Sequence, residues 1–298
     1  MFKNHPKGLL AAALSNMGER FGYYIMNAVL VLFLCSKFGL PEGQSTTIYS
    51  VFYAGIYVLS LVGGLIADRT QNYKATIKTG LVIMASGYVL LSIPILSTAE
   101  NINWLLPLTC GALFLIAFGN GLFKGNLQAI VGQMYDDLEA EAAKEGPEAL
   151  KAAKDKRDSG FQIFYVFINV GGLIAPFVAP LLREWWLGTN GLVYNAQLPA
   201  LCHEFLTNGS AMATDAFNNL SALMTQVGAN VSDMANECQR YLQIFNEGIH
   251  YSFIASVAAM VISLVIFFFS QKRFPNPAKK EAVKSVDYTP EEKAAAAK

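Results

Sequence analysis

The sequence predicts an all-α membrane protein, a polytopic bundle of six transmembrane helices. Of its 298 residues, 53% are apolar or aromatic and 15% are charged, whereas a soluble domain carries about 25% charged residues. Six apolar runs are each long enough to cross a bilayer, which takes about 20 helical residues. Lipid accepts only helices and closed barrels as spanning structures, and these runs are too long for barrel strands.

Each apolar run is bounded by polar or charged residues. The first run continues through Tyr23 and Tyr24 without a small-residue cleavage site, so it is a span and not a signal peptide. The first and fourth runs exceed the length needed, and we expect them to tilt or protrude. The predicted bundle covers residues 1–275, and the charged, Ala-rich residues 276–298 are a cytoplasmic linker or tail. The spans are placed at residues 8–36, 44–67, 75–98, 103–131, 160–182 and 245–271.

Basic residues gather on one side of the predicted bundle. The amino terminus, the loop after the second span, the loop after the fourth span and the tail hold 17 of the 22 Lys and Arg residues. Because loops rich in Lys and Arg stay in the cytoplasm, both termini are expected there. We assign the chain to a bacterial-type plasma (inner) membrane.

Two connections between spans are long. Residues 134–159 are rich in Ala, Glu and Lys and predict a solvated cytoplasmic helix that is interrupted at Gly146-Pro147. Residues 184–244 form an exterior loop that begins with Trp185 and Trp186, where an interfacial aromatic belt would lie. This loop holds Cys202 and Cys238 in a compartment that should be oxidising. A disulfide between them and two free or separately buried thiols are both compatible with the sequence.

Three charged residues, Glu19, Arg20 and Lys124, lie deep inside predicted spans and away from the span ends, where a charge is costly and usually marks a pathway or a coupling site. In the first span, polar residues recur at intervals of three and four, which places most of them on one helical face. That face must look into the bundle or into a water-filled cavity. A structural ion pair is the alternative to a functional site. The polar residues are Asn16, Glu19, Arg20, Tyr23, Tyr24 and Asn27.

The fourth span repeats this pattern, because Asn120, Lys124 and Gln128 are four residues apart and share a face. With Glu19 as the only acid at this depth, Arg20 and Lys124 leave one positive charge in excess, and a cavity with that balance attracts a carboxylate. In the alternative, Lys124 pairs only with Glu19 and never touches substrate. Close helix contact is predicted beside three glycines, Gly119, Gly121 and Gly125.

Two further spans carry polar stripes. In the fifth, Tyr165 and Asn169 lie on one face. In the second, Tyr49, Tyr53 and Tyr57 follow one another at four-residue steps. Such a stripe is often simple packing, but a hydroxyl in lipid needs a partner, and Tyr57 lies near the middle of its span. We therefore expect Tyr57 to line the cavity.

Four motifs together resemble a known family. Residues 19–24 (ERFGYY) resemble the ERFxYY signature of the first helix in proton-dependent oligopeptide transporters, a branch of the major facilitator superfamily. Residues 64–69 (GLIADR) are similar to the superfamily motif at the cytoplasmic end of helix two. Residues 119–126 (GNGLFKGN) resemble the GxGxxKPN stretch of helix four, and residues 164–172 (FYVFINVGG) the FYxxINxG signature of helix five. The resemblance covers roughly residues 1–275 and implies the N-terminal six-helix half of a major-facilitator fold.

The resemblance also implies roles for individual residues. Glu19, Arg20 and Lys124 would take part in proton coupling, and Asp68 and Arg69 would belong to a cytoplasmic gate. The chain departs from the family pattern at Asn16, where the family has an acid, at Asn27, where it often has a base, and at Gly125, where it has a proline. The substrate site would be lined by Tyr23, Tyr24, Tyr57, Lys124 and Asn169, and we add Asn27, Gln128 and Tyr165 because they lie on the same helical faces.

The function that this reading predicts is secondary active import of di- and tripeptides, coupled to protons by alternating access. Protons would be the coupling ion, without a further cofactor. The partners would be small peptides, the lipid bilayer and a missing C-terminal six-helix half. One alternative is a transporter of the same fold for another small anionic or zwitterionic solute. Another is a non-transporting membrane subunit or sensor that binds a partner through residues 184–244.

Other classes of protein are excluded by composition and spacing. The 22 basic and 22 acidic residues balance, which removes the case for a nucleic-acid binder. The four Cys residues form no short-spaced pair, so no metal site is expected. His5, His203 and His250 are scattered along the chain, and no nucleophile, base and acid come together at membrane depth. We therefore do not expect an enzyme.

Overall fold

The computed structural model describes residues 5–275, and the predicted tail at 276–298 lies outside them. Six of the helices in this range are long and apolar enough to cross a membrane, which confirms the predicted all-α fold with six spans. They are α1 (Leu9–Phe38), α2 (Glu42–Thr70), α3 (Tyr73–Ser92), α4 (Ile102–Glu145), α5 (Pro147–Thr189) and α8 (Met234–Ser270). The connection between α5 and α8 holds α6 (Leu198–Asn208) and α7 (Thr214–Gln226), and the short 3₁₀ turns are η1 (Gly209–Ala211), η2 (Val231–Asp233) and η3 (Gln271–Arg273).

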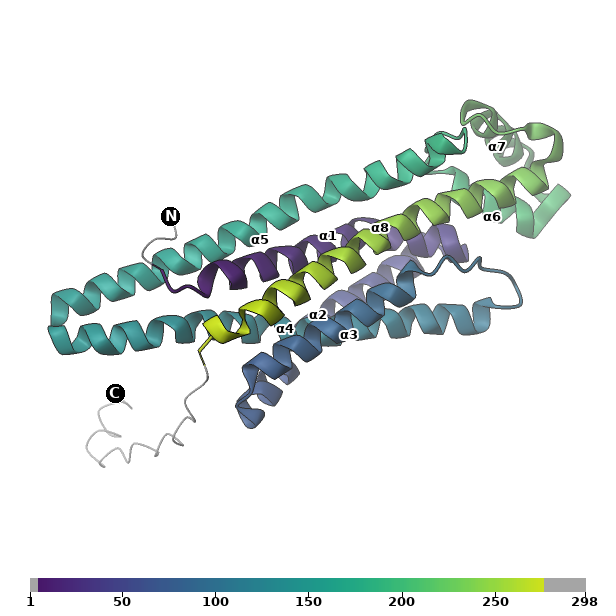
Figure 1. Ribbon diagram of the computed structural model, residues 1–298. Helices are drawn as coiled ribbons and strands as arrows, with labels where there is room; N and C mark the ends of the chain where they lie inside the picture. Colours follow the sequence, from purple (N-terminus) through teal and green to yellow (C-terminus); the bar gives the residue numbers. More distant parts are fainter. Residues whose placement is uncertain (1–4, 276–298) are drawn as a thin grey trace, which may run out of the picture.

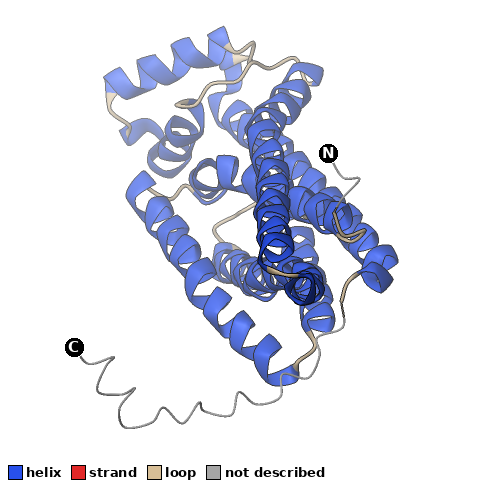
Figure 2. Cartoon of the chain, turned by 90° about the vertical axis from the view of Figure 1, so that its left-hand side faces the viewer, coloured by secondary structure: helices blue, strands red, loops and turns tan. Residues whose placement is uncertain are grey.

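The long helices run side by side (Figure 1), and the described residues form helices and loops without a strand (Figure 2). Helix α1 is the central element, packed against α5 and α8, while α4 packs against α2 and α3. In the most apolar stretch of α1, 61% of the residues are buried, compared with 22% in α2 and 17% in α5. Helices α2 and α5 therefore present most of their apolar surface outward.

The start of α1, the end of α8 and the tip of the α4–α5 hairpin lie at one end of the bundle, and α6 and α7 lie at the other (Figure 1). We call the second of these the α6–α7 end. Successive spans run in opposite directions. After four or six spans the chain is therefore back at the end of the bundle where α1 starts.

The hairpin formed by α4 and α5 continues well past the predicted ends of the fourth and fifth spans. Helix α4 runs to Glu145 and α5 starts at Pro147, so the predicted interruption lies between two continuous helices. Gly146 makes the turn at φ 128°, where a side chain would be strained. Arg157 then ties the two helices together, since its Nη1 lies 2.8 Å from Asp136 Oδ1 and 3.3 Å from Glu139 Oε1.

The third helix ends earlier than its apolar run. Helix α3 stops at Ser92, whereas the predicted span runs to residue 98. The cause is Pro94, which has no amide hydrogen and disfavours helical geometry at Ile93 before it. Ile93 is extended, at φ −74° and ψ 117°. Residues 93–98 are therefore not helical, although Ile93, Ile95 and Leu96 extend the apolar run.

Glycines let α4 approach its neighbours closely. A Cβ atom on Gly63 of α2 would lie 2.2 Å from the Gly121 carbonyl oxygen, and one on Gly80 of α3 would lie 2.7 Å from the Gly119 carbonyl oxygen. The predicted close contact is thus present at Gly119 and Gly121. It is absent at Gly125, where a Cβ atom would meet open space.

These contacts predict a difference in stability between two adjacent glycines. Gly63→Ala is expected to lower the free energy of unfolding by about 1–3 kcal/mol, the usual cost of overpacking a tight interface. Gly64→Ala is the matched control, because its Cβ atom would meet nothing within 4 Å. Thermal unfolding of the two variants in detergent measures the difference, and equal midpoints would contradict the close contact as a determinant of stability.

Candidate functional site

The candidate site is built around an ion pair inside α1. Glu19 is 0% exposed and Arg20 is 7% exposed. Arg20 Nε lies 2.5 Å from Glu19 Oε2 and Arg20 Nη2 lies 2.7 Å from Glu19 Oε1. The guanidinium therefore donates a hydrogen bond to each carboxylate oxygen. A bidentate pair of this kind is among the strongest arrangements of opposite charges. The two buried charges are thereby neutralised within one helix.

Helix α4 supplies a third donor to the same carboxylate. Asn120 Nδ2 donates to Glu19 Oε1 over 2.7 Å, so the polar face of α4 meets that of α1. The Asn120 Oδ1 atom is buried without a hydrogen-bond partner. The Glu19 carboxylate therefore accepts three hydrogen bonds and joins α1 to α4.

A cavity of about 220 Å³ adjoins this ion pair, between α1, α2 and α4. Arg20 lies over the ring of Tyr23, with 5.0 Å from its Cζ atom to the ring centroid. Across the cavity, the Lys124 ammonium lies 5.1 Å from the ring centroid of Tyr57. The lining combines two cations with phenol hydroxyls and consists of Arg20, Tyr23, Tyr24, Asn27, Tyr49, Tyr53, Ile56, Tyr57 and Lys124.

Most of the sequence-predicted residues meet in this cavity. Tyr23, Tyr24, Asn27, Tyr57 and Lys124 all line it. Three further lining residues were missed as site residues, and two of them carry a sequence signal, since they belong to the tyrosine stripe that ends at Tyr57. The Tyr53 and Tyr57 hydroxyls are 3.0 Å apart and hydrogen-bonded. The missed residues are Tyr49, Tyr53 and Ile56.

Three predicted substrate residues do not line the cavity. Gln128 is half-buried one turn further along α4, and Tyr165 and Asn169 lie on the exposed side of α5. Helix α5 packs against α1 through another face, where a Cβ atom on Gly171 would lie 2.7 Å from the Met17 carbonyl oxygen. The roles of Gln128, Tyr165 and Asn169 stay predictions.

Lys124 has no salt-bridge partner within residues 5–275. The alternative in which Lys124 is neutralised by Glu19 is therefore not the arrangement found, because Arg20 and Asn120 occupy that carboxylate. Glu19 cancels the charge of Arg20, and the ammonium remains as the excess positive charge beside the cavity. Its chemistry suits a carboxylate ligand.

The predicted gate residues lie where α2 ends, far along the helix from the cavity. The Tyr73 hydroxyl of α3 donates to the Asp68 carboxylate, and Arg69 is exposed. Gln71 ends α2 in the left-handed region, at φ 51°. The structure thus ties Asp68 to the next helix, and the gate itself stays a prediction.

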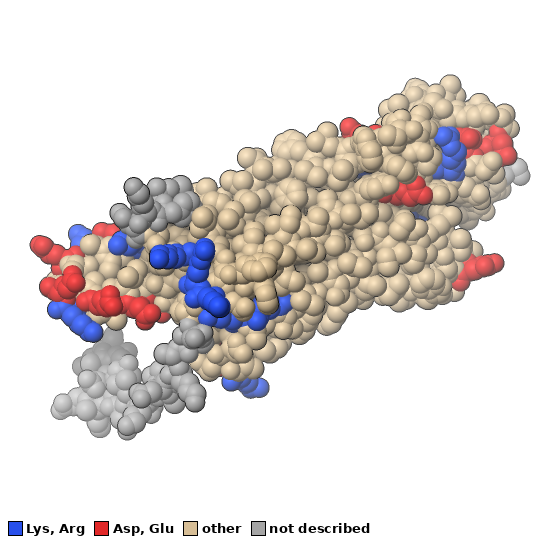
Figure 3. All heavy atoms as spheres, viewed as in Figure 1, with Lys and Arg blue, Asp and Glu red and all other residues tan. Residues whose placement is uncertain are grey.

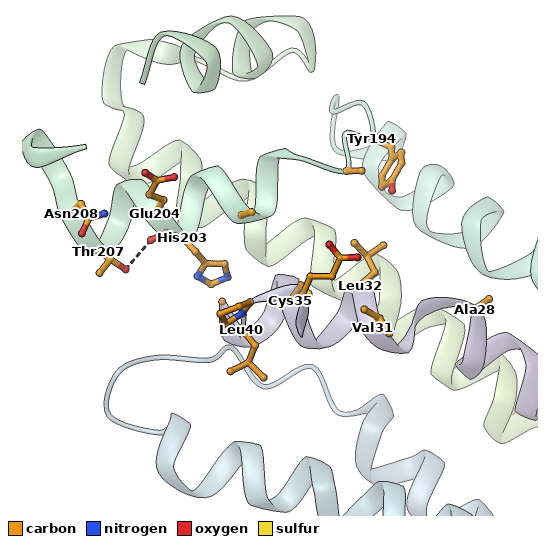
Figure 4. A pocket seen from close by; sticks show the side chains of 15 residues that line it. Ala28, Val31, Leu32, Cys35, Leu40, Tyr194, His203, Glu204, Thr207 and Asn208 are labelled. Atoms are coloured by element: carbon orange, nitrogen blue, oxygen red, sulfur yellow. Dashed lines mark hydrogen bonds between the residues drawn. The ribbon is translucent and has the colours of Figure 1, made fainter. Parts of the chain in front are cut away.

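A second, larger cavity of about 750 Å³ lies at the α6–α7 end (Figure 4). Its walls are α1, the turn between α1 and α2, Tyr194 and α6. Ala28 and Val31 continue the α1 face that carries Tyr24, but this cavity contains neither of the intramembrane cations. We therefore assign the candidate site to the smaller cavity.

The remaining candidates for chemistry are the metal-ligating side chains and the cysteines. Across residues 5–275, no group of three His, Cys, Asp or Glu residues could hold a metal ion. Cys202 and Cys238 are both buried and are free thiols in the structure. They are hydrogen-bonded to each other, and the disulfide stays a prediction.

One buried cluster was not anticipated. The Lys37 ammonium lies 3.3 Å from His250 Nε2, and His250 Nδ1 lies 2.7 Å from the Leu91 carbonyl oxygen. Because a carbonyl can only accept, Nδ1 carries the ring proton, and Nε2 accepts from Lys37. The contact joins α1, α3 and α8 at the α6–α7 end.

The chain is similar in sequence to known membrane transporters. The sequence model of the POT family matches residues 74–287. The di-/tripeptide transporter of Lactococcus lactis subsp. cremoris is 34% identical over 184 residues, which is 59% of this chain and 32% of that protein. Dipeptide and tripeptide permease B of Yersinia enterocolitica is 27% identical over 273 residues, which is 88% of this chain and 48% of that protein.

Solved structures show the same likeness. The crystal structure of peptide transporter POT in complex with sulfate superimposes with a TM-score of 0.58 at 26% identity, covering 100% of this chain and 44% of that one. The chain therefore spans about a third to a half of the length of the relatives it matches. Its six apolar helices and these relatives make it an integral membrane protein. Because the POT model matches more than half of the chain, the protein belongs to the POT family, whose members are transporters and not enzymes.

Proposed function

We propose that the chain is the N-terminal half of a proton-coupled importer of di- and tripeptides that works by alternating access. The observation that carries the proposal is the buried Glu19–Arg20 pair beside a small cavity in which Lys124 has no salt-bridge partner among the described residues. A titratable acid and a free cation are thus placed around one polar space. The relatives named as di- and tripeptide transporters support peptides as the substrate class.

Substrate binding would begin with the peptide carboxylate, which meets the Lys124 ammonium. Hydrogen bonds from the hydroxyls of Tyr53 and Tyr57 and from the Asn27 amide would hold the peptide backbone. Asn27 Oδ1 is buried without a partner, which leaves it ready to accept a hydrogen bond. These contacts involve the backbone and the terminal groups, which all peptides share. They would therefore allow peptides with many different side chains to bind.

Proton coupling would act through Glu19. Protonation removes the negative charge that accepts from Arg20 and Asn120, so it releases the guanidinium into the cavity. The released cation is a second partner for an anionic group of the substrate. Each proton that enters with the membrane potential contributes about 2.3 kcal/mol per 100 mV, which would drive accumulation of the peptide.

Alternating access would require a second six-helix half, since transporters of this type rock two halves about a site between them. The outward apolar surface of α2 and α5 is where a second half or lipid would lie. We also propose that both termini are cytoplasmic in a bacterial-type inner membrane. In Figure 3 the charged side chains gather towards the two ends of the face in view, with a long uncharged band between them.

Uptake by the full-length protein in proteoliposomes tests the proposal. Labelled dialanine should accumulate above its external concentration when the outside is acidic and the inside is negative. Collapse of both gradients by an ionophore should reduce the internal concentration to the external one. Accumulation that is the same with and without the pH gradient would contradict proton coupling. Inhibition of uptake by unlabelled small anions but not by unlabelled dipeptides would favour the alternative substrate class.

A further inference from the structure

The two cysteines between α5 and the membrane portion of α8 meet in the fold. Cys202 lies on α6 and Cys238 lies in the first turns of α8, and both side chains are 0% exposed. Their thiols are within hydrogen-bonding distance of each other. Since 35 residues separate them in the sequence, the packing of α6 on α8 brings them together.

We propose that Cys202 and Cys238 form a disulfide that fastens α6 to α8. The two thiols lose two protons and two electrons as one S–S bond forms. A disulfide-bearing oxidant accepts them and is reduced to two thiols. The proposal requires the α6–α7 end to face an oxidising compartment and does not depend on which solute the protein carries.

The state of the thiols indicates when the bond forms. Both side chains are 0% exposed, so an oxidant cannot reach the two sulfur atoms once α6 has packed on α8. We therefore expect oxidation to precede the packing of α6, and the bond, once formed, to be shielded from reductants.

The bond has a structural consequence for the larger cavity. The residue after Cys202 is His203, whose Nε2 lies 2.8 Å from the Ser36 carbonyl oxygen near the end of α1. Helix α6 is thus held on one side by α8 and on the other by α1. Figure 4 shows His203 directed from α6 towards the end of α1. His203 and Glu204 line the cavity, so the bond fixes the position of one of its walls.

Differential alkylation of the full-length protein in its own membranes tests the bond. The sample is quenched with acid, denatured, treated with N-ethylmaleimide with or without prior reduction, and digested for mass spectrometry. Without reduction, Cys202 and Cys238 should be unlabelled and recovered in one cross-linked peptide, while Cys35 and Cys110 are labelled. After reduction all four should be labelled. Full labelling of Cys202 and Cys238 without reduction overturns the proposal.

Two variants make the assignment specific. Cys202→Ser should free Cys238 for labelling without reductant, and Cys110→Ser, at an exposed position, should leave the cross-linked peptide unchanged. Hydrogen exchange tests the consequence for α6, because amides of residues 198–208 should exchange at least several-fold faster in the Cys202→Ser variant, where the bond cannot form. Exchange that is unchanged in that variant would contradict a role for the bond in holding α6. Neither measurement uses transport, so failure here is distinct from failure of the proposed function.

Discussion

Glu19→Gln in the full-length protein is expected to abolish uphill accumulation of dipeptide while peptide exchange continues. The amide cannot gain or lose the proton that controls the Arg20 guanidinium, so the gradient no longer acts on the site. With about 2.3 kcal/mol per charge at 100 mV, and a factor of ten for each 1.4 kcal/mol, the expected loss is about 50-fold in the accumulation ratio. Uptake and counterflow in the same proteoliposomes measure the two activities.

Counterflow also controls for folding of this variant. Removing one partner of a buried pair costs about 3–5 kcal/mol, so a variant that fails in both assays could simply be unfolded. Glu100→Gln is the matched control, because Glu100 is exposed before the start of α4. Undiminished uphill uptake by the Glu19→Gln variant would exclude Glu19 from coupling, whereas retained counterflow with lost accumulation would support it.

Lys124→Gln is expected to raise the KM for dipeptides with a free carboxylate by about 10–150-fold. A hydrogen bond to a charged group contributes about 1.5–3 kcal/mol, and each 1.4 kcal/mol is a factor of ten. A dipeptide amide lacks the carboxylate, so its KM should change by much less. Initial rates of uptake for the two substrates give the comparison.

The matched control for this prediction is Lys144→Gln on the exposed α4–α5 hairpin, which should leave both KM values unchanged. The comparison between substrates separates a direct contact from a general loss of activity. If the acid and the amide lost affinity equally, Lys124 would act on the cavity as a whole and not on the substrate carboxylate.

The spans were predictable because crossing a bilayer is a matter of apolar length. The ends of helices depend on local backbone geometry and not on mean hydropathy. Helix α3 ends at Ser92 because of Pro94, and the hydropathy of the segment gives no sign of this. Helix α6 lay in a segment that was predicted only as a loop. Its start at Leu198-Pro199 and its end before Gly209 are ordinary helix signals that could have revealed it.

The site was predictable where one helical face holds all the polar residues. Glu19, Arg20 and Tyr23 share such a face. Because charged groups must be buried away from lipid, this face has to point into the bundle. In α5 the face that carries Tyr165 and Asn169 is not the side that packs on α1, because Asn169 lies on the exposed side. The polar pattern of this span therefore did not reveal its packing face. Lys37 and His250 are 213 residues apart, and only the packing of α1 on α8 brings them together.

Glu19 and Arg20 are consecutive residues of α1, and this has an electrical consequence. When the helix tilts, the opposite charges travel together, so the membrane voltage does almost no net work on them. Once the carboxylate is neutral, the same movement carries one uncompensated charge through the field, and voltage can then favour one tilt over the other. The Glu19–Arg20 pair thus contributes to voltage sensitivity only when Glu19 is protonated.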